Sequence, residues 1–74
     1  MDDLQVVLGR RVRQRRKRLG LSQEQLAERA DLHWTYVSGV ERGRRNPSLT
    51  TLARLAAALG LTLPQLVSKL RAAK

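Results

Sequence analysis

The stretch LGLSQEQLAERADLHWTYVSGVERG, residues 19–43, decides the fold. Its apolar residues follow two short helical periods that are separated by a turn of a few residues. Ser22, with Gln25 three residues later, has the spacing of a capping box and predicts a helix over residues 22–30. The helical period resumes over residues 33–42 and predicts a second helix. Two short helices joined in this way predict a helix-turn-helix unit.

Five residues of this stretch meet the demands of the corner between two such helices. Ala27 is small where the helix over residues 22–30 crosses the helix over residues 33–42, and Asp31 tolerates the positive φ that the turn requires. Leu32 then fills the turn, while Val37 and Val40 anchor the later helix inward. Other helical hairpins satisfy several of these demands, so the pattern favours the unit without being unique to it.

Helical periods also run before and after this unit, and no strand pattern is present. Gly20 and Gly60 can end helices in the left-handed conformation, and Ser48 and Thr62 can begin helices as caps. We therefore expect an all-α fold, a compact five-helix domain over residues 1–74. The helices are predicted at about residues 4–19, 22–30, 33–42, 48–59 and 63–72.

Composition restricts the classes of function. Fifteen lysines and arginines stand against six acidic residues, so the 74-residue chain has a net charge of +9. With 42% apolar residues it can form a small core and is too apolar for a disordered basic tail. No apolar run is long enough to span a membrane and no signal peptide is recognisable, so we expect a cytoplasmic protein. The excess positive charge predicts a polyanionic partner.

Residues suited to catalysis or metal binding are sparse. The chain has no cysteine and one histidine, so it can form no disulfide, and no metal site is expected. Asp31 and His33 could suggest a hydrolytic triad together with a serine. They lie only two residues apart around a turn, however, and no oxyanion-hole element is evident. We therefore expect no enzyme activity and no cofactor.

Three segments of the sequence resemble one known family. They are LGLSQEQLA at residues 19–27, YVSGVERG at 36–43 and NPSL at 46–49, and they resemble the phage repressor/Cro-like (XRE) helix-turn-helix family. Within that family, TYVSGVERG at residues 35–43 looks most like the controller proteins of restriction–modification systems. The resemblance covers about residues 8–70. It implies the lambda repressor-like fold, with the helix-turn-helix in the second and third helices.

The resemblance also implies duplex DNA binding by a two-fold dimer, with the third helix in the major groove. The positions that face base edges in the family are occupied here by Trp34, Thr35, Ser38 and Gly39. The positions that contact the DNA backbone are occupied by Gln23, Arg42, Arg44, Arg45 and Asn46. A free helix N-terminus at Gln23 would favour a phosphate even without the resemblance.

Four residues on or near the third helix need separate interpretation. Trp34, where many family members have a polar base reader, could contact DNA or pack across the corner between the second and third helices. Tyr36 could pack on the loop, but it is expected to contact DNA, at a phosphate, a sugar or a thymine methyl group, because the apolar stripes are complete without it. A glycine inside a helix lowers stability by about 1 kcal/mol relative to alanine. Close approach to DNA, or tolerance of glycine at an exposed site, would explain the presence of Gly39 equally well. His33 is expected to cap the helix or to lie exposed.

Seven cations and no acid lie between Arg10 and Arg18. Such a run is commonly a solvated face, but Arg16 lies on the inner stripe of the first helix. The apolar members of that stripe are Leu4, Leu8, Val12 and Leu19. A charge on a buried stripe needs a partner, and Glu41 has the same misfit on the third helix. A structural Arg16–Glu41 ion pair is the simplest solution, and it matches a pair that the resemblance implies.

The last two helices have more apolar surface than one small domain needs. The stripe of the fourth helix comprises Leu49, Leu52, Leu55, Ala56 and Leu59. The fifth helix adds Leu66, which is expected in the core, and three residues expected in a dimer interface. These three are Leu63, Val67 and Leu70. The alternative is that all four pack inward and that DNA alone brings two monomers together.

These observations predict a regulator of transcription that binds duplex DNA sequence-specifically, as a homodimer on palindromic operators, in the manner of a restriction–modification controller. An antitoxin or a phage-type repressor of the same fold is the nearest alternative. A basic protein-interaction or membrane-surface module that uses the first helix is an alternative from another class, but the capped helices and the complete core argue against it. RNA polymerase is a further expected partner, whereas no membrane and no small-molecule ligand is expected.

Overall fold

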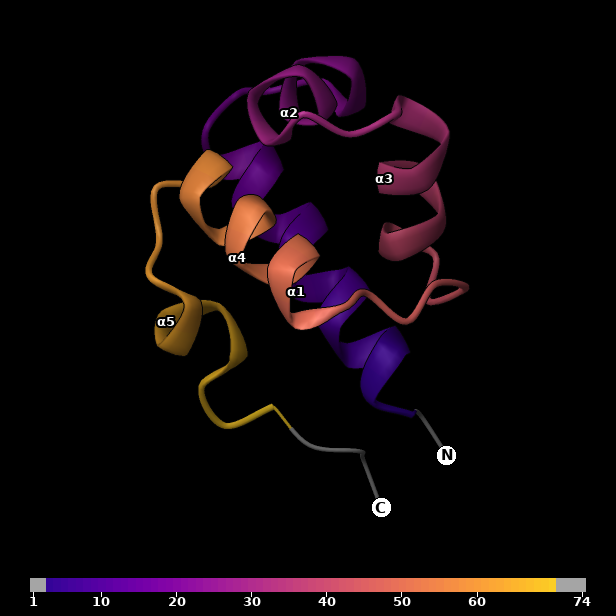
Figure 1. Ribbon diagram of the computed structural model, residues 1–74, viewed down its shortest axis with the longest axis vertical. Coiled ribbons are helices and arrows are strands. Elements are labelled where there is room, and N and C mark those ends of the chain that lie inside the picture. Colours follow the sequence, from indigo (N-terminus) through magenta and orange to yellow (C-terminus); the bar gives the residue numbers. More distant parts are fainter. Residues whose placement is uncertain (1–2, 71–74) are drawn as a thin grey trace.

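The computed structural model describes residues 3–70 as five helices, with no strand among them. In Figure 1, α1 runs behind α4, α2 and α3 lie at the top and right, and α5 lies at the left. The all-α, five-helix fold is confirmed. The helices are α1 (Leu4–Arg18), α2 (Gln23–Ala30), α3 (Trp34–Glu41), α4 (Leu49–Ala58) and α5 (Leu63–Val67).

Side-chain caps set the starts of the helices where the sequence predicts them. The Ser22 hydroxyl accepts from the Gln25 amide at 3.0 Å, while the Gln25 side chain accepts from the Ser22 amide at 2.8 Å. Thr62 forms the same reciprocal box at the start of α5, and Ser48 caps α4. Each cap satisfies backbone N–H groups that have no partner inside the helix, and this fixes where the chain enters each helix.

The corner between α2 and α3 has the conformation that the sequence predicts. Asp31 adopts the left-handed conformation, with φ 56° and ψ 48°. The Leu32 amide then donates to the carbonyl of Ala27 at 2.9 Å, which closes the end of α2. Ala27 is buried where the helices cross, and Leu32 packs partly buried against the core. The corner therefore sets the direction of α3 through local bonds.

The core lies between α1, α4 and the helix-turn-helix. Its large, fully buried side chains come from all five helices and from the end of α4. They are Val12, Leu26, Val37, Val40, Leu55, Leu59 and Leu66. Burial of each such side chain stabilises the fold by about 1.5–3 kcal/mol relative to exposure. Val37 and Val40 belong to α3, so the same packing that closes the core also fixes the helix expected to read DNA.

Gly9 allows α1 to approach the end of α3 more closely than any other residue would. A Cβ at Gly9 would lie 2.3 Å from the carbonyl oxygen of Val40 and 2.7 Å from that of Glu41. Both oxygens belong to the backbone, which cannot move aside as a flexible side chain would. A glycine inside a helix can thus reflect close backbone contact, and sequence reasoning missed this one.

Three leucines expected on inner stripes are largely exposed instead. Leu49 is 70% exposed, Leu4 50% and Leu19 40%. Each lies at or next to a helix terminus: Leu4 and Leu49 begin α1 and α4, and Leu19 follows the last residue of α1. An apolar period continues to the end of a helix, but burial requires a neighbouring element that extends as far. The stripes were therefore predicted too long.

The fifth helix is shorter than predicted. It ends at Val67, and Ser68 then has extended dihedrals while Lys69 has φ 58°. The Arg11 guanidinium donates from Nη1 to the carbonyl of Leu66 at 2.8 Å and to that of Ser68 at 2.5 Å. These bonds satisfy carbonyls that a longer helix would use internally. The remainder of the predicted helix, residues 71 and 72, lies outside the described residues.

Candidate nucleic-acid interface

A buried network joins the ends of three helices behind α3. Arg16 donates from Nε to Glu41 Oε2 at 2.5 Å and from Nη2 to Glu41 Oε1 at 3.0 Å. Its Nη1 also donates to the carbonyl of Leu21 at 2.8 Å, and Gln23 donates from Nε2 to Glu41 Oε1 at 3.1 Å. The structure therefore brings Arg16 and Glu41 together as a two-bond pair. It adds Gln23, for which sequence reasoning proposed only a phosphate contact.

Arg16 holds its charge over the whole neutral range. Hydrogen bonding to Glu41, together with the charge of that carboxylate, raises the pKa of the Arg16 guanidinium, although burial acts in the opposite direction. A group whose pKa is raised by folding contributes its stabilisation at every pH below its ordinary pKa. That contribution is lost only as the pH rises through the folded-state value. Arg16 therefore stays charged at any pH at which the protein would bind DNA.

The N-terminus of α3 presents exposed side chains. The His33 Nδ1 accepts from the Thr35 amide at 3.2 Å and lies 2.7 Å from the Thr35 hydroxyl, so His33 is the cap of α3. Trp34 is 49% exposed and stacks on His33, with the ring centroids 6.3 Å apart. Of the two placements considered for Trp34, packing in the core is therefore wrong. Trp34 and Thr35 are both accessible from solvent.

Gly39 and Tyr36 lie beneath the side chain of Arg45. Gly39 is buried, and a Cβ there would lie 2.9 Å from Cγ of Arg45. The Arg45 guanidinium carbon lies 5.5 Å from the centroid of the half-buried Tyr36 ring, within the range of a cation–π contact. The expectation that Gly39 merely tolerates an exposed site is therefore wrong. In this structure the glycine makes room for the stem of Arg45.

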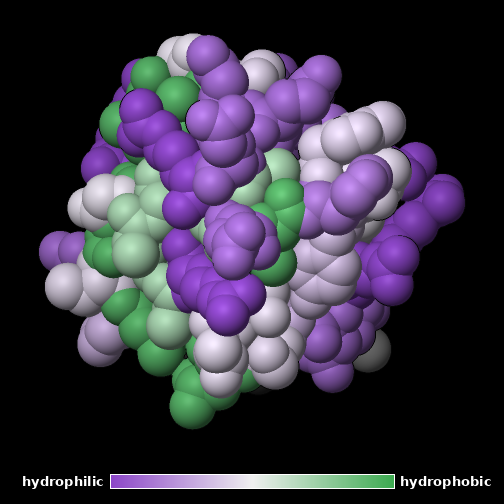
Figure 2. Space-filling model, turned by 45° about the horizontal axis from the view of Figure 1, so that its top comes forward, coloured by the Kyte–Doolittle hydropathy of each residue, from purple (hydrophilic) through white to green (hydrophobic). Residues whose placement is uncertain are grey.

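The loop after α3 places its cations on the outside. Arg42, Arg44, Arg45 and Asn46 are exposed, whereas Pro47 is buried and anchors the loop before α4. Figure 2 shows hydrophilic atoms along the right-hand edge, the side of α3 and this loop, and more apolar atoms on the left. We call the accessible residues of α3 together with this loop the α3 face. It comprises Trp34, Thr35, Ser38, Arg42, Arg44, Arg45 and Asn46.

The arginines of α1 are not simply a solvated face. Arg15 donates from Nε to the carbonyl of Leu59 at 3.0 Å, at the end of α4. Arg11 holds the end of α5 as described above, and Arg16 forms the buried pair. Arg11, Arg15 and Arg16 are therefore occupied by the fold itself. A carbonyl partner far along the chain leaves no local sequence signal, and sequence reasoning missed the carbonyl contacts of Arg11 and Arg15.

The three residues expected in a dimer interface lie on and after α5. Leu63, Val67 and Leu70 are each half-buried, whereas Leu66 is fully buried in the core. In Figure 1 α5 lies on the side of the molecule opposite α3. Among residues 3–70 no group of acidic and histidine side chains is placed to hold a metal. No described helix is long and apolar enough to cross a membrane.

Comparison with known proteins gives a single family. Residues 12–66 match the family described as helix-turn-helix. The control protein C.SmaI of Serratia marcescens is 46% identical over 67 residues, 90% of this chain and 80% of that protein. C.MunI of a Mycoplasma species is 42% identical, over 92% and 93% of the two chains. The crystal structure of the restriction–modification controller protein C.AhdI from Aeromonas hydrophila superposes with a TM-score of 0.81 at 47% identity, covering 84% of this chain and 94% of that one. The chain therefore belongs to the XRE-type helix-turn-helix family of DNA-binding transcription regulators.

Proposed function

We propose that this chain controls transcription by binding a two-fold symmetric duplex operator as a homodimer, as a restriction–modification controller. The observation that supports it most is the rigid mounting of the α3 face. Val37 and Val40 bury one side of α3, and the Arg16–Glu41 pair fixes its C-terminal end. A reading helix that is held in this way loses little conformational freedom when it enters a major groove.

Trp34, Thr35 and Ser38 are proposed to read base edges. Thr35 and Ser38 offer hydroxyls that both donate and accept, and Trp34 offers an apolar ring suited to a thymine methyl group. Gly39, the fourth proposed base-reading position, contacts DNA only after the side chain of Arg45 has moved away from it. Specificity in this proposal rests on uncharged side chains.

The DNA backbone is proposed to contact the loop cations and the start of α2. Arg42, Arg44, Arg45 and Asn46 reach phosphates from the exposed loop. Gln23 is the first residue of α2, where unpaired N–H groups and the helix dipole favour a phosphate. Its side chain is held by Glu41, so a phosphate at this position would be bound by a preorganised group. Tyr36 joins this set once Arg45 has moved off its ring.

Leu63, Val67 and Leu70 are proposed to form the two-fold contact. Their half-burial leaves apolar surface that a second copy would cover, since an isolated small domain gains stability from association. A two-fold contact near α5 would set two recognition helices about 34 Å apart, one turn of DNA. The chain acts by binding rather than by catalysis, in the cytoplasm, without a small-molecule ligand, and RNA polymerase is the proposed protein partner at the promoter.

Selection of bound duplexes from a random pool tests the proposal directly. A two-fold symmetric motif is expected, and a motif without symmetry would contradict binding as a dimer. Sedimentation at micromolar concentration without DNA tests the interface separately. Val67→Asp should weaken association there, with Ala53→Asp, an exposed position on α4, as the matched control. A strict monomer would mean that DNA alone pairs the monomers, whereas unchanged association of the Val67→Asp variant would place the two-fold contact elsewhere on the surface.

A further inference from the structure

A second basic surface lies away from the α3 face. It is an open groove of about 270 Å³ between α1 and the segment that joins α4 to α5. Three arginines of α1 line one wall, and two glutamine side chains and one leucine complete it. The lining residues are Arg11, Gln14, Arg15, Arg18, Leu61 and Gln65. We call this the α1 groove.

The α1 groove contains positive charge that the fold does not neutralise. Arg11 and Arg15 donate to backbone carbonyls, which are neutral, and Arg18 has no hydrogen-bond partner within residues 3–70. None of the three forms an ion pair with a described carboxylate. An arginine has five donors, so Arg11 and Arg15 keep N–H groups for a further acceptor. Three like charges side by side favour an anionic occupant.

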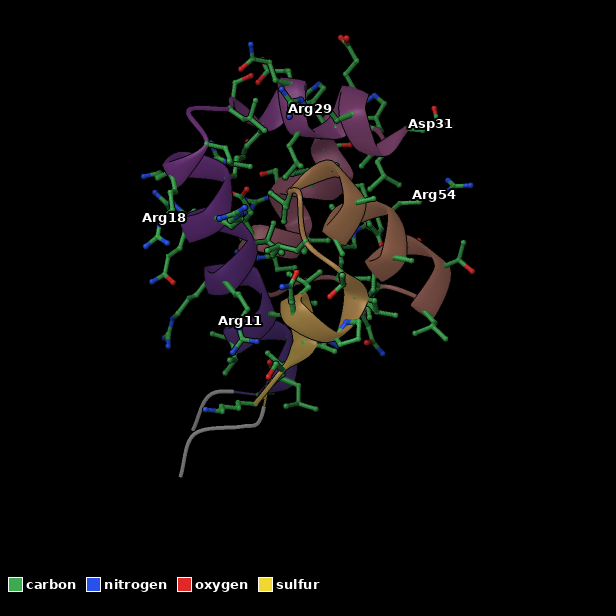
Figure 3. All side chains as sticks on the ribbon, turned by 90° about the vertical axis from the view of Figure 1, so that its left-hand side faces the viewer. Arg11, Arg18, Arg29, Asp31 and Arg54 are labelled. Atoms are coloured by element: carbon green, nitrogen blue, oxygen red, sulfur yellow. The ribbon has the colours of Figure 1, made fainter. Side chains whose placement is uncertain are left out.

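The α1 groove does not belong to the α3 face. Figure 3 views the molecule from the side opposite α3, and Arg11 and Arg18 lie on α1 at the left of that view. We therefore expect the α1 groove to stay open to a second occupant when α3 lies in a major groove.

The spacing of Arg11 and Arg15 is close to that of alternate side chains in an extended peptide, and the spacing of Arg15 and Arg18 is about 2 Å shorter. Arg11, Arg15 and Arg18 follow one side of α1, with rises of about 6 Å and about 4.5 Å between successive residues. Alternate side chains of an extended chain lie about 6.6 Å apart on the same side. Gln14 and Gln65 offer amide donors and acceptors suited to a peptide backbone, and the half-buried Leu61 offers apolar surface to a neighbouring side chain.

We propose that the α1 groove binds an extended acidic segment of a partner protein, with carboxylates at alternate positions and an apolar residue beside Leu61. This surface and the α3 face would be occupied at the same time, one by the partner and the other by DNA. The regulator would thus link an acidic protein to its operator. The inference does not depend on which operator is bound.

The test titrates a blocked hexapeptide, Glu-Ser-Glu-Leu-Glu-Ser, into the whole chain and follows the backbone amides by NMR. The chemical shifts of amides that line the groove should change until they saturate, and a peptide with Gln in place of each Glu should produce no such change. Arg18→Gln should weaken peptide binding about fivefold, the upper range for a partly exposed ion pair. Because Arg18 has no hydrogen-bond or ion-pair partner among the described residues, the variant should remain folded and bind operator DNA as before.

Arg13→Gln is the matched control, since Arg13 is exposed on α1 outside the groove. It should leave peptide binding almost unchanged. Equal weakening by Arg13→Gln and Arg18→Gln would mean general charge attraction and would overturn the proposal, as would the absence of saturable shifts. Tighter binding of a single-stranded oligonucleotide at the same amides would assign the groove to nucleic acid instead. If the unsubstituted chain binds the peptide but no operator DNA, the result would count against the proposed operator function alone.

Discussion

The arginines of α1 and those of the loop after α3 have the same chemistry and opposite surroundings. Arg11, Arg15 and Arg16, which we call the inner arginines, donate to carbonyls or to a carboxylate of the fold. The loop arginines Arg42, Arg44 and Arg45 are exposed. Of their three side chains, only that of Arg45 has a hydrogen-bond, ion-pair or ring contact with a described residue, the ring of Tyr36. Net charge alone does not distinguish the two groups.

This difference teaches that a basic run next to a helix-turn-helix need not be a DNA-binding run. Arg15 and Arg11 satisfy backbone groups at the ends of α4 and α5, where helices leave carbonyls without partners. The loop arginines lie on a short connection whose buried Pro47 fixes it beside α3. We therefore expect inner-arginine variants to change folding stability first and loop-arginine variants to change DNA affinity first.

The largest expected effect is that of Arg16→Ala on stability. The substitution leaves Glu41 buried without its cation, which should lower the free energy of unfolding by about 3–5 kcal/mol. Urea denaturation followed by circular dichroism measures it. A double-mutant cycle with Glu41→Ala should show strong coupling, and additive effects would mean that the pair contributes nothing specific. Arg42→Ala, a loop arginine, is the control and should leave stability nearly unchanged.

The second effect concerns the uncharged side chains of the α3 face. Thr35→Ala and Ser38→Ala should each change which base pairs are preferred. The binding free energy that separates the preferred base pair from the others should change by about 1–3 kcal/mol. Competition binding against single-base operator variants measures this change. If both variants keep the original preference, sequence recognition would rest instead on Trp34 or on DNA shape. Both outcomes separate the side chains that specify sequence from the arginines that position the duplex.

The third effect is that of Arg11→Gln, which removes a charged donor from the carbonyls of Leu66 and Ser68. We expect a loss of about 1.5 kcal/mol in stability, since hydrogen bonds from charged groups contribute about that much. Hydrogen exchange of the α5 amides should become faster, whereas exchange in α3 should not. Unchanged exchange in α5 would mean that Arg11 is a solvated cation, and the stated difference between the inner arginines and the loop arginines would not hold for it.

The smallest effect on folding is expected for Arg44→Gln. Its free energy of unfolding should lie within about 0.5 kcal/mol of that of the unsubstituted protein. Its effect should appear in DNA binding instead. Loss of one phosphate contact lowers the slope of log affinity against log salt by about one and weakens all sequences alike. Binding isotherms at several salt concentrations measure the slope. A slope that Arg44→Gln leaves unchanged would remove Arg44 from the backbone contacts.

Local signals predicted most of the fold. The capping boxes at Ser22 and Thr62 and the left-handed turn at Asp31 involve residues within four positions of each other, and the structure has all three. The juxtaposition of Arg16 and Glu41 was also predictable, because a charge on a buried stripe has few possible partners. The length of α5 was not, since its end depends on Arg11, more than fifty residues earlier.

The sequence by itself determined the helices, the corner and the family, because caps, turns and apolar periods act over three or four residues. Only the tertiary structure decided that Gly9 lies against the backbone of α3 and that Gly39 lies under Arg45. It also decided that Trp34 is exposed and which arginines turn inward. These features depend on which surfaces meet when separate helices pack, and a carbonyl or a close backbone contact leaves no pattern in the sequence that faces it.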